Sequence, residues 1–172
     1  AGRRTPAGIK TIHRLVNAFL EIDLKSGRRL SRRFEAYDDV IPSMKDWAVG
    51  MRASDFLRKV EGKLLTSGLN TRRIINGYTV IDSIKAITTL DATDFLKIYG
   101  TSSERALLFT GVKYGRSPMI AIKAHPLKPA MVVYVQPENI DELAVKLAEI
   151  EGLPLVSTDM DLEPMLEAPG RL

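Results

Sequence analysis

Residues 131–157, MVVYVQPENIDELAVKLAEIEGLPLVS, decide the fold of this chain. They open with the apolar run MVVYV at 131–135 and close with a second one, LPLVS at 153–157. Short apolar runs rich in β-branched residues and bounded by Gly or Pro are typical of buried strands. Between the runs, apolar residues recur at helical spacing after Pro137-Glu138, where an acid favours the helix dipole. Two strands joined by a helix predict a βαβ unit with parallel strands and a right-handed crossover.

Two further apolar runs precede this unit, ALLFT at 106–110 and MIAIK at 119–123, and both predict strands. A short helix is expected over residues 91–99, where a capping residue precedes a helical run that stops at a glycine. These elements predict a small α/β domain over residues 91–166, followed by a tail at 167–172.

The first part of the chain, residues 1–90, is expected to be mainly helical. Apolar residues between positions 9 and 20 recur at a period of about 3.6, which predicts an amphipathic helix that ends before Gly27. A second helix is expected from Ser54. The run 78–90 fits a strand or a helix, and a third helix is favoured over residues 81–87. The predicted fold class is therefore α+β or α/β, with a basic, mainly helical part followed by an α/β domain.

The composition excludes several classes of protein. The 172 residues are 45% hydrophobic and 27% charged, which argues against wholesale disorder. No apolar run approaches the roughly 18 residues that span a bilayer, and the start lacks a hydrophobic signal core, so we expect a cytoplasmic protein with no membrane partner. Without cysteine there is no disulfide or thiolate metal site. Neither His13 nor His125 has an evident partner for a triad or zinc site, so no metal, cofactor or catalytic residue is predicted.

Charge is divided unevenly along the chain. Residues 1–80 hold 16 basic and 8 acidic side chains, a balance of +8, whereas residues 81–172 hold 9 and 13, a balance of −4. The densest basic stretch is LKSGRRLSRRF at 24–34, which contains no acid. Because guanidinium groups bind phosphates through paired hydrogen bonds, this stretch and a second arginine pair predict a contact with nucleic acid. The residues assigned to this contact are Lys25, Arg28, Arg29, Arg32, Arg33, Arg72 and Arg73.

Other interpretations of the arginines remain open. They can pair with the acids of the second half of the chain, or lie in a solvated turn. A helix-turn-helix over residues 54–76 would place Arg72 and Arg73 on a recognition helix, although Asn76-Gly77 would break that helix after about two turns.

A nuclease is the enzymatic alternative. The Asp23-x-Lys25 spacing resembles part of a metal-dependent nuclease core, in which a carboxylate binds Mg²⁺ and the lysine supports the attacking water. That core needs another carboxylate on a preceding strand, and no acid lies upstream of Glu21.

Glycines and cations cluster in GVKYGRS, residues 111–117, which links two of the expected strands. Such a link allows backbone amides to approach a phosphate or carboxylate, although a glycine-bearing hairpin explains it equally well. The spacing is not that of a Walker loop, and no helix is expected directly after it. The end of the last strand is a second candidate, because ligands of open α/β sheets bind there. The ligand-binding residues predicted on these grounds are Gly111, Lys113, Gly115, Arg116, Ser157, Thr158 and Asp159.

Residues 131–166 resemble the closing part of DRTGG-type domains. The resemblance lies in the apolar strand, in the helix and turn ELAVKLAEIEGLPLV at 142–156, and in the Ser-Thr pair before an acid at 157–159. It implies a Rossmann-like α/β sensor module of bacterial and archaeal regulatory proteins, where such modules accompany DNA-binding or CBS segments.

These patterns predict a two-part regulator of transcription. Its basic part contacts nucleic acid, either DNA or RNA, and its α/β part binds a small anionic ligand or a protein partner. The alternative is an RNA- or ribosome-associated protein whose arginines follow the shape of the RNA backbone.

Overall fold

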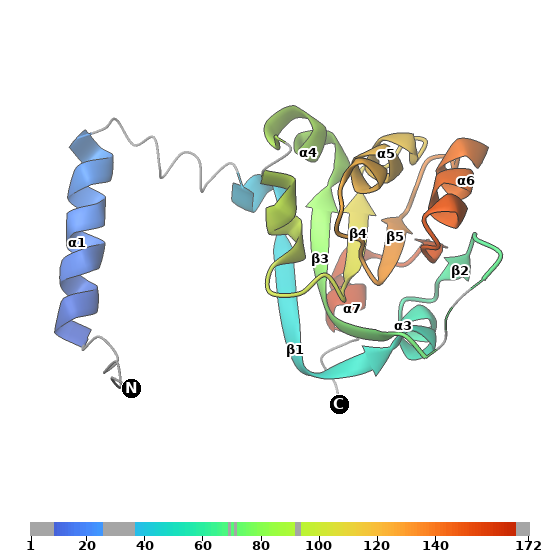
Figure 1. Cartoon of the computed structure of the whole chain (residues 1–172), viewed down its shortest axis with the longest axis horizontal. Coiled ribbons are helices and arrows are strands. Elements are labelled where there is room, and N and C mark those ends of the chain that lie inside the picture. Colours follow the sequence, from blue (N-terminus) through green and yellow to red (C-terminus); the bar gives the residue numbers. More distant parts are fainter. Residues whose placement is uncertain (1–8, 26–36, 69, 71, 92–93, 168–172) are drawn as a thin grey trace. The chain divides into compact units, whose positions relative to one another are not determined.

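The computed structural model of the chain divides into two compact units, Ala1–Tyr37 and Asp38–Leu172, and each is described by itself (Figure 1). The structure describes residues 9–25, 37–68, 70, 72–91 and 94–167.

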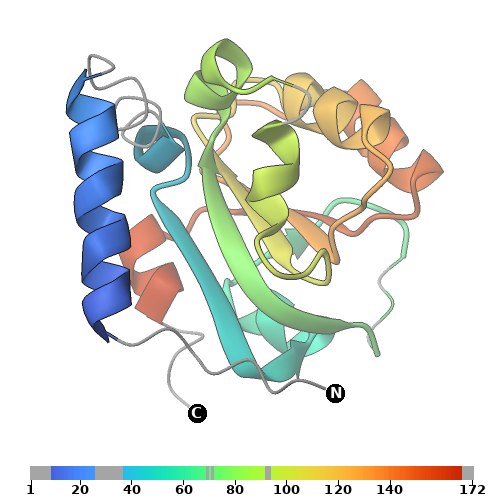
Figure 2. The same ribbon diagram turned by 60° about the vertical axis from the view of Figure 1, so that its left-hand side comes forward.

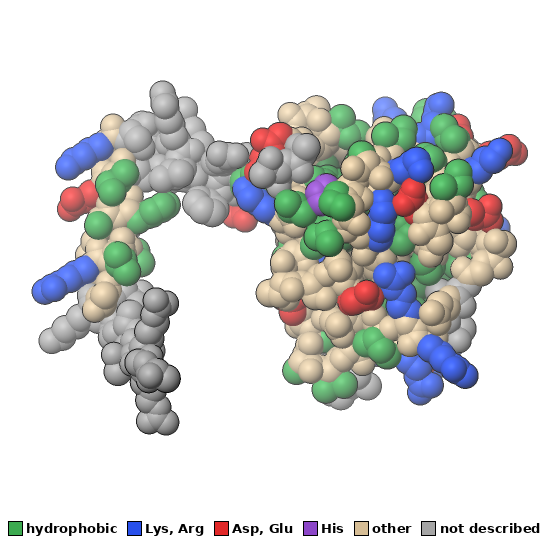
Figure 3. Space-filling view, viewed as in Figure 1, with side chains coloured by type: hydrophobic (Ala, Val, Ile, Leu, Met, Phe, Trp, Pro, Cys, Tyr) green, Lys and Arg blue, Asp and Glu red, His purple; other side chains and the backbone are tan. Residues whose placement is uncertain are grey.

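The first unit contains the helix α1, Ile9–Lys25, as the sequence predicts. Hydrophobic side chains gather on one side of α1 and charged side chains on another (Figure 3). The amphipathic pattern inferred from the spacing of apolar residues is therefore confirmed. Within the described ranges, no helix is long and apolar enough to cross a membrane.

The second unit is built on a six-stranded sheet with the order β1-β3-β4-β5-β6-β2. Strands β3 to β6 are parallel neighbours in chain order, while β1 and β2 run antiparallel at the two edges. In Figure 2, β1 and β3 form a long, bent pair at one edge. The strands are β1 (Ser43–Arg52), β2 (Lys63–Leu64), β3 (Ile74–Asp82), β4 (Ala106–Thr110), β5 (Met131–Val135) and β6 (Leu155–Thr158). The helices are α3 (Ala53–Lys59), α4 (Ser83–Thr89), the 3-10 helix η1 (Asp94–Tyr99), α5 (Arg116–Ala124), α6 (Glu142–Ile150) and α7 (Leu162–Glu167).

Helices cover both faces of this sheet, and successive side chains of each strand contribute to opposite faces. In β4, Leu107 and Phe109 belong to the core that also contains residues of η1, α5 and α6. Ala106 and Leu108 belong to the other core, which contains the fully buried Phe56 of α3. Parallel strands buried on both faces appear in the sequence as unbroken apolar runs, which is why β4 and β5 are recognisable there.

The βαβ unit expected from residues 131–157 is confirmed. Strand β5 pairs with β6 in parallel, with Val133 opposite Val156, and α6 connects them. The expected strand at 106–110 is β4, and the expected helix at 91–99 is η1. The mixed α/β fold class is therefore confirmed as well.

Residues 119–123 are not the expected strand, because they lie in the helix α5. Met119 and Ile122 are fully buried, whereas Ile120 between them is 53% exposed. This is the spacing of one helical face and not the alternation of a strand. An apolar run of this length fits a buried strand and a helix equally well, so its own residues could not decide between them.

Helix α6 begins at Glu142 and not at Pro137. Asp141 caps it, since its Oδ1 accepts a hydrogen bond of 2.8 Å from the N–H of Leu143. The N–H groups of residues 138–139 donate to a neighbouring loop, so this segment is held outside the helix.

Residues 74–82 form β3, which the sequence left open as a strand or a helix from residue 78, and the helix-turn-helix considered over residues 54–76 is therefore wrong. Gly77, which in the sequence suggested the break of a recognition helix, lies opposite Asp46 of β1. A Cβ atom at Gly77 would lie 2.2 Å from the carbonyl oxygen of Lys45. The glycine therefore permits close approach of two strands.

The helix expected over residues 81–87 is only partly correct. Residues 81 and 82 end β3, and α4 begins at Ser83. The change occurs at Asp82, whose Oδ1 accepts hydrogen bonds of 3.0 Å from the N–H groups of Ile84 and Lys85. A carboxylate in this position caps the first turn and stabilises the helix start.

The domain boundary expected at residue 90 is also wrong. Strand β3 pairs with β4 over its C-terminal half, with Val80 opposite Leu108, so residues 43–82 share one sheet with the later strands. These residues are not mainly helical, because they supply β1, β2 and β3. Their only helix, among those described, is α3, which ends at Lys59 where the sequence favoured a longer one.

Helices α5 and α6 are linked at the surface by Glu151. Its Oε1 lies 2.9 Å from Nζ of Lys123, and its Oε2 lies 3.0 Å from Nζ of Lys128. Hydrogen bonds from Lys123 and then Lys128 lower the pKa of Glu151 below its ordinary value. A carboxyl group whose pKa is lower in the folded state favours folding once it is ionised.

We therefore expect Glu151 to stabilise the fold above its ordinary pKa of 4.5 and to lose this effect as the pH falls through the lowered folded-state pKa. A Glu151→Gln variant should show a smaller fall in unfolding free energy across that acidic window than the unmodified protein. Urea unfolding at a series of pH values from about 2 to 6 measures the difference. Parallel pH dependences in the two proteins would contradict the role of Glu151.

Candidate functional site

A glycine loop joins the end of β4 to the start of α5. Gly111 and Gly115 have φ angles of 65° and 76°, in the left-handed region that favours glycine. Since α5 starts at Arg116, the sequence-based expectation that no helix follows the loop is wrong. The observed order of strand, glycine loop and helix is one that binds anions in many proteins, because the N–H groups of the first helical turn point out of the helix.

The loop is held in place through its carbonyl groups. The carbonyl oxygens of Val112, Lys113 and Tyr114 accept hydrogen bonds of 3.0, 2.9 and 3.0 Å from the N–H groups of residues 138, 139 and 141. Among the described residues, none accepts a hydrogen bond from the N–H groups of residues 112–115. The carbonyl groups of residues 112–114 are therefore already hydrogen-bonded, while the N–H groups of residues 112–115 are available to bind a ligand.

Tyr134 of β5 fixes the end of the same loop. This side chain is fully buried, and its hydroxyl donates a hydrogen bond of 2.6 Å to the carbonyl oxygen of Gly115. Burial raises the pKa of Tyr134 far above its ordinary value, so the hydroxyl keeps its proton and remains a donor. A Cβ atom at Gly115 would lie 2.4 Å from the Tyr134 ring, which leaves room only for glycine.

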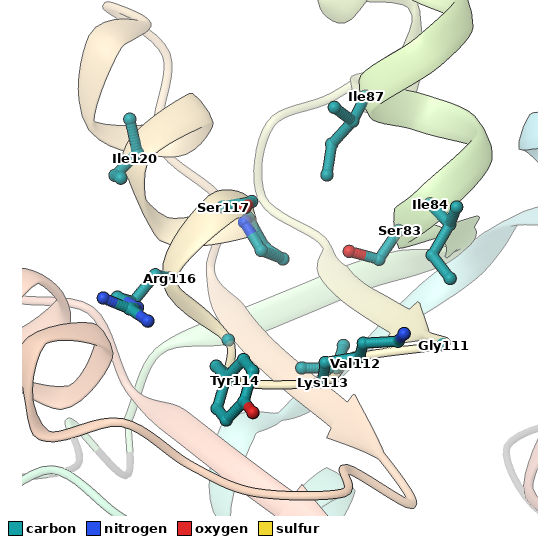
Figure 4. Close-up of a pocket in the computed structure, with 12 residues that line it drawn as sticks. Ser83, Ile84, Ile87, Gly111, Val112, Lys113, Tyr114, Arg116, Ser117 and Ile120 are labelled. Carbon is teal, nitrogen blue, oxygen red and sulfur yellow. The ribbon is translucent and has the colours of Figure 1, made fainter.

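A pocket of about 460 Å³ opens beside this loop, between α4 and α5 (Figure 4). It lies beyond the carboxyl ends of β3 and β4, where ligands of open α/β sheets bind. Its volume is in the range of small-molecule sites. The pocket is lined by Ser83, Ile84, Ile87, Gly111, Val112, Lys113, Tyr114, Gly115, Arg116, Ser117, Pro118 and Ile120.

The charged groups of the pocket are cations. Lys113 is exposed and has no ion pair within the part of the chain that the structure describes. The Nε of Arg116 lies 3.4 Å from Oδ2 of Asp141, and its guanidinium lies over the ring of Tyr114, 5.7 Å from the centroid. No side chain caps the start of α5, which leaves the positive end of its dipole facing the loop.

Of the predicted ligand-binding residues, the structure brings together Gly111, Lys113, Gly115 and Arg116 in this pocket. The sequence missed Ser83 and the isoleucines of α4, since β3 and its turn into α4 are not apparent in it. The capping sequence Asp82-Ser83 is the one signal there that could have located the start of α4.

The three residues predicted at the end of β6 lie elsewhere. Strand β5 separates β6 from β4, and none of the three lines the pocket. Thr158 is buried, and its hydroxyl donates a hydrogen bond of 2.6 Å to the carbonyl oxygen of Val60. Ser157 pairs with Lys63 of β2, and the carbonyl of Asp159 accepts a hydrogen bond from the Gln136 side chain. These contacts join β6 to its neighbours.

The basic residues predicted to contact nucleic acid have different surroundings. Lys25 lies exposed in the last turn of α1. Arg72 is exposed, whereas the Nε of Arg73 lies 3.2 Å from Oε2 of Glu104. Arg73 therefore pairs with an acid of the second half, as one of the alternative interpretations expects. The other four, Arg28, Arg29, Arg32 and Arg33, lie outside the described residues.

The nuclease alternative required another carboxylate on a strand that precedes Asp23. Asp23 and Lys25 instead lie in the final turns of the helix α1. Among the described residues, no group of three or more His, Asp or Glu side chains could hold a metal ion.

Comparison with known proteins gives two close matches, although no family model matches the chain. One is an uncharacterized HTH-type transcriptional regulator of Methanocaldococcus jannaschii, 37% identical over an alignment of 174 positions that covers 96% of this chain and 72% of that protein. The other, from Archaeoglobus fulgidus, has the same description and is 40% identical over an alignment of 166 positions that covers 93% of this chain and 71% of the relative. Matches of this extent include residues of both units.

Proposed function

The chain belongs to the family of HTH-type transcriptional regulators that these two relatives represent, and we propose that it binds DNA through its basic N-terminal part. The observation that carries this proposal is the extent of the matches, 96% and 93% of the chain at 37% and 40% identity. Regulators of transcription act on DNA, and the charge balance of +8 over residues 1–80 suits a polyanionic partner.

The arginine stretch at 24–34 is the proposed contact with the DNA backbone. Its cations fit phosphate groups, and phosphate contacts position a protein on the duplex without reading its sequence. Arg72 is exposed and remains a candidate for the same contact. Arg73 contributes less, because its guanidinium already pairs with Glu104.

The α/β unit is proposed to be the sensing module of the regulator. Its support is the resemblance of residues 131–166 to DRTGG-type domains, together with a pocket of about 460 Å³ at the carboxyl ends of β3 and β4. In this arrangement, DNA binding and ligand binding belong to different parts of one chain.

Replacing Arg28, Arg29, Arg32 and Arg33 together by glutamine is expected to weaken binding to duplex DNA by about a thousandfold at 0.1 M salt. Each phosphate contact adds about 0.9 to the slope of log affinity against log salt, so the slope should fall by up to about 3.6 units. Fluorescence anisotropy with a labelled duplex of mixed sequence, measured from about 50 to 200 mM salt, gives both quantities.

The matched control removes four positive charges from the sheet-containing unit, at Arg52, Arg58, Lys59 and Lys63. It should bind DNA with nearly the slope of the unmodified protein. Negligible DNA binding at low salt, or an equal loss in both variants, would refute the proposed contact. Tighter binding to structured RNA than to duplex DNA would replace it with the RNA-associated function.

A further inference from the structure

We infer that the pocket between α4 and α5 binds a small phosphomonoester with an apolar or aromatic body. The inference rests on the proposed sensing role of the α/β unit and specifies the chemistry of its ligand. The phosphate would lie at the glycine loop and the start of α5, and the body would lie against the isoleucines of α4 and α5.

The glycine loop provides the phosphate end of the site. The N–H groups of residues 112–115 have no acceptor among the described residues, while the carbonyls of residues 112–114 are bound to the neighbouring loop. The loop therefore presents donors that are fixed in position before a ligand arrives. The uncapped start of α5 adds the positive end of a helix dipole in the same place.

Ser83 is independent evidence for a polar ligand, because it comes from a different strand and helix. Its side chain lines the pocket, and the residue is only 6% exposed. Within the described structure its hydroxyl has no hydrogen-bond partner, so it is available to bond a polar group of a ligand in the pocket. Figure 4 shows the hydroxyl pointing from α4 toward α5, into the space that a ligand would fill.

The balance of charge favours an anion. Lys113 lies at the pocket without an ion pair in the described structure, and Arg116 lies beside it. Asp82 caps α4, and Asp141 both caps α6 and pairs with Arg116, so these two carboxylates already have partners. No acidic side chain is among the described residues that line the pocket.

The isoleucines indicate that the ligand has more than an anionic group. Ile84 and Ile87 of α4 are 53% and 63% exposed, and Ile120 of α5 is 53% exposed. All three line the same pocket, on the two helices that border it. Because inorganic phosphate would leave these side chains in water, a ligand with an apolar or aromatic body would gain additional burial there.

Isothermal titration calorimetry of the full chain with phenyl phosphate, inorganic phosphate, phenol and benzoate tests this ligand chemistry. Phenyl phosphate should bind at least about tenfold more tightly than each of the other three, because it alone combines the phosphate with the ring. Adenosine monophosphate and adenosine form a second pair of probes, of which only the nucleotide should bind. Equal binding of phenol and phenyl phosphate, or no binding of either phosphate ester at millimolar concentration, would overturn the inference.

Two conservative variants locate the binding. Lys113→Gln removes the free cation and Ser83→Ala removes the unpaired hydroxyl, and each should weaken phenyl phosphate binding by about tenfold. The controls Lys146→Gln, on the exposed side of α6, and Ser103→Ala should leave it unchanged. Thermal unfolding of each variant should match that of the unmodified protein, which shows that the variant is folded. Unaltered phenyl phosphate binding in both pocket variants would overturn the assignment of the ligand to this pocket.

The salt dependence of DNA binding separates this inference from the proposed function. Lys113→Gln and Ser83→Ala should bind duplex DNA with the slope of the unmodified protein in the absence of ligand. If the protein binds DNA but no phosphate ester, only the phosphomonoester pocket is refuted. Phosphate ester binding without DNA binding refutes the proposed function alone.

Discussion

An Arg105→Ala variant is expected to unfold with a free energy about 3 to 5 kcal/mol below that of the unmodified protein. Arg105 is fully buried directly before β4, where it pairs with Asp46 of β1. Its Nη1 donates a hydrogen bond of 2.8 Å to the hydroxyl of Thr79, and its Nε donates one of 2.9 Å to the carbonyl of Ser102. The side chain therefore joins β1, β3 and β4 at one point.

Burial by itself opposes the charge of Arg105, since it lowers the pKa of the guanidinium. Asp46→Ala removes the counter-charge and should cost about 2 kcal/mol, less than a fully buried partner would, because Asp46 is 44% exposed and water can replace it. Urea unfolding of each variant measures these losses.

The control for Arg105 is Arg58→Ala, which removes an exposed ion pair with Asp55 and should cost less than about 1 kcal/mol. An Arg105→Ala variant as stable as Arg58→Ala would show that the buried network does not support the sheet. Arg105→Met, which keeps most of the volume without the charge, should recover part of the loss.

The second large effect is expected at Gly115, where alanine should cost about 3 kcal/mol. Part of this cost, about 1 kcal/mol, is the left-handed backbone, at φ 76°. The rest comes from the Tyr134 ring, which lies 2.4 Å from the position of a Cβ atom and is fully buried. Urea unfolding of Gly115→Ala and the unmodified protein measures the sum.

Gly152 offers a matched control for this comparison. Its φ of 63° is also left-handed, but no atom of the described residues lies within 4 Å of a Cβ atom placed there, so Gly152→Ala should cost only about 1 kcal/mol. Since Gly115 shapes the loop beside the pocket, its variant should also lose phenyl phosphate binding. Equal destabilisation by the two substitutions would show that the contact with Tyr134 imposes no constraint.

Only some of the residues that line the pocket could be predicted from the sequence. Gly111, Lys113, Gly115 and Arg116 are close in the chain, so their combination of glycines and cations is visible without a structure. Ser83 is 28 positions before Gly111 and joins the same pocket only because β3 and β4 are parallel neighbours. The position of Ser83 in the pocket could not be predicted from the residues next to it in the sequence, because strand pairing alone brings it close to the glycine loop.

The sequence by itself located the elements that have the strongest local patterns. The runs at 106–110 and 131–135 form β4 and β5, and the run at 153–157 overlaps β6, because unbroken apolar runs bounded by Gly or Pro suit strands that are buried on both faces. Helix α1 followed from its regular apolar period. The excess of basic residues in the first half, and with it the interpretation as a regulator of transcription, also came from the sequence, and the relatives support that interpretation.

Tertiary structure alone decided the remainder. The run at 119–123 is apolar enough for a strand, but it folds as α5 because the glycine loop turns the chain onto one face of the sheet. Strand β3 contains Asn76 and Gly77, which favour turns locally. These two residues are held in the strand because Gly77 pairs with β1 and the N–H of Asn76 donates a hydrogen bond to the carbonyl oxygen of Glu104. Long-range pairing outweighs local preference at these positions, since each preference amounts to about 1 kcal/mol or less.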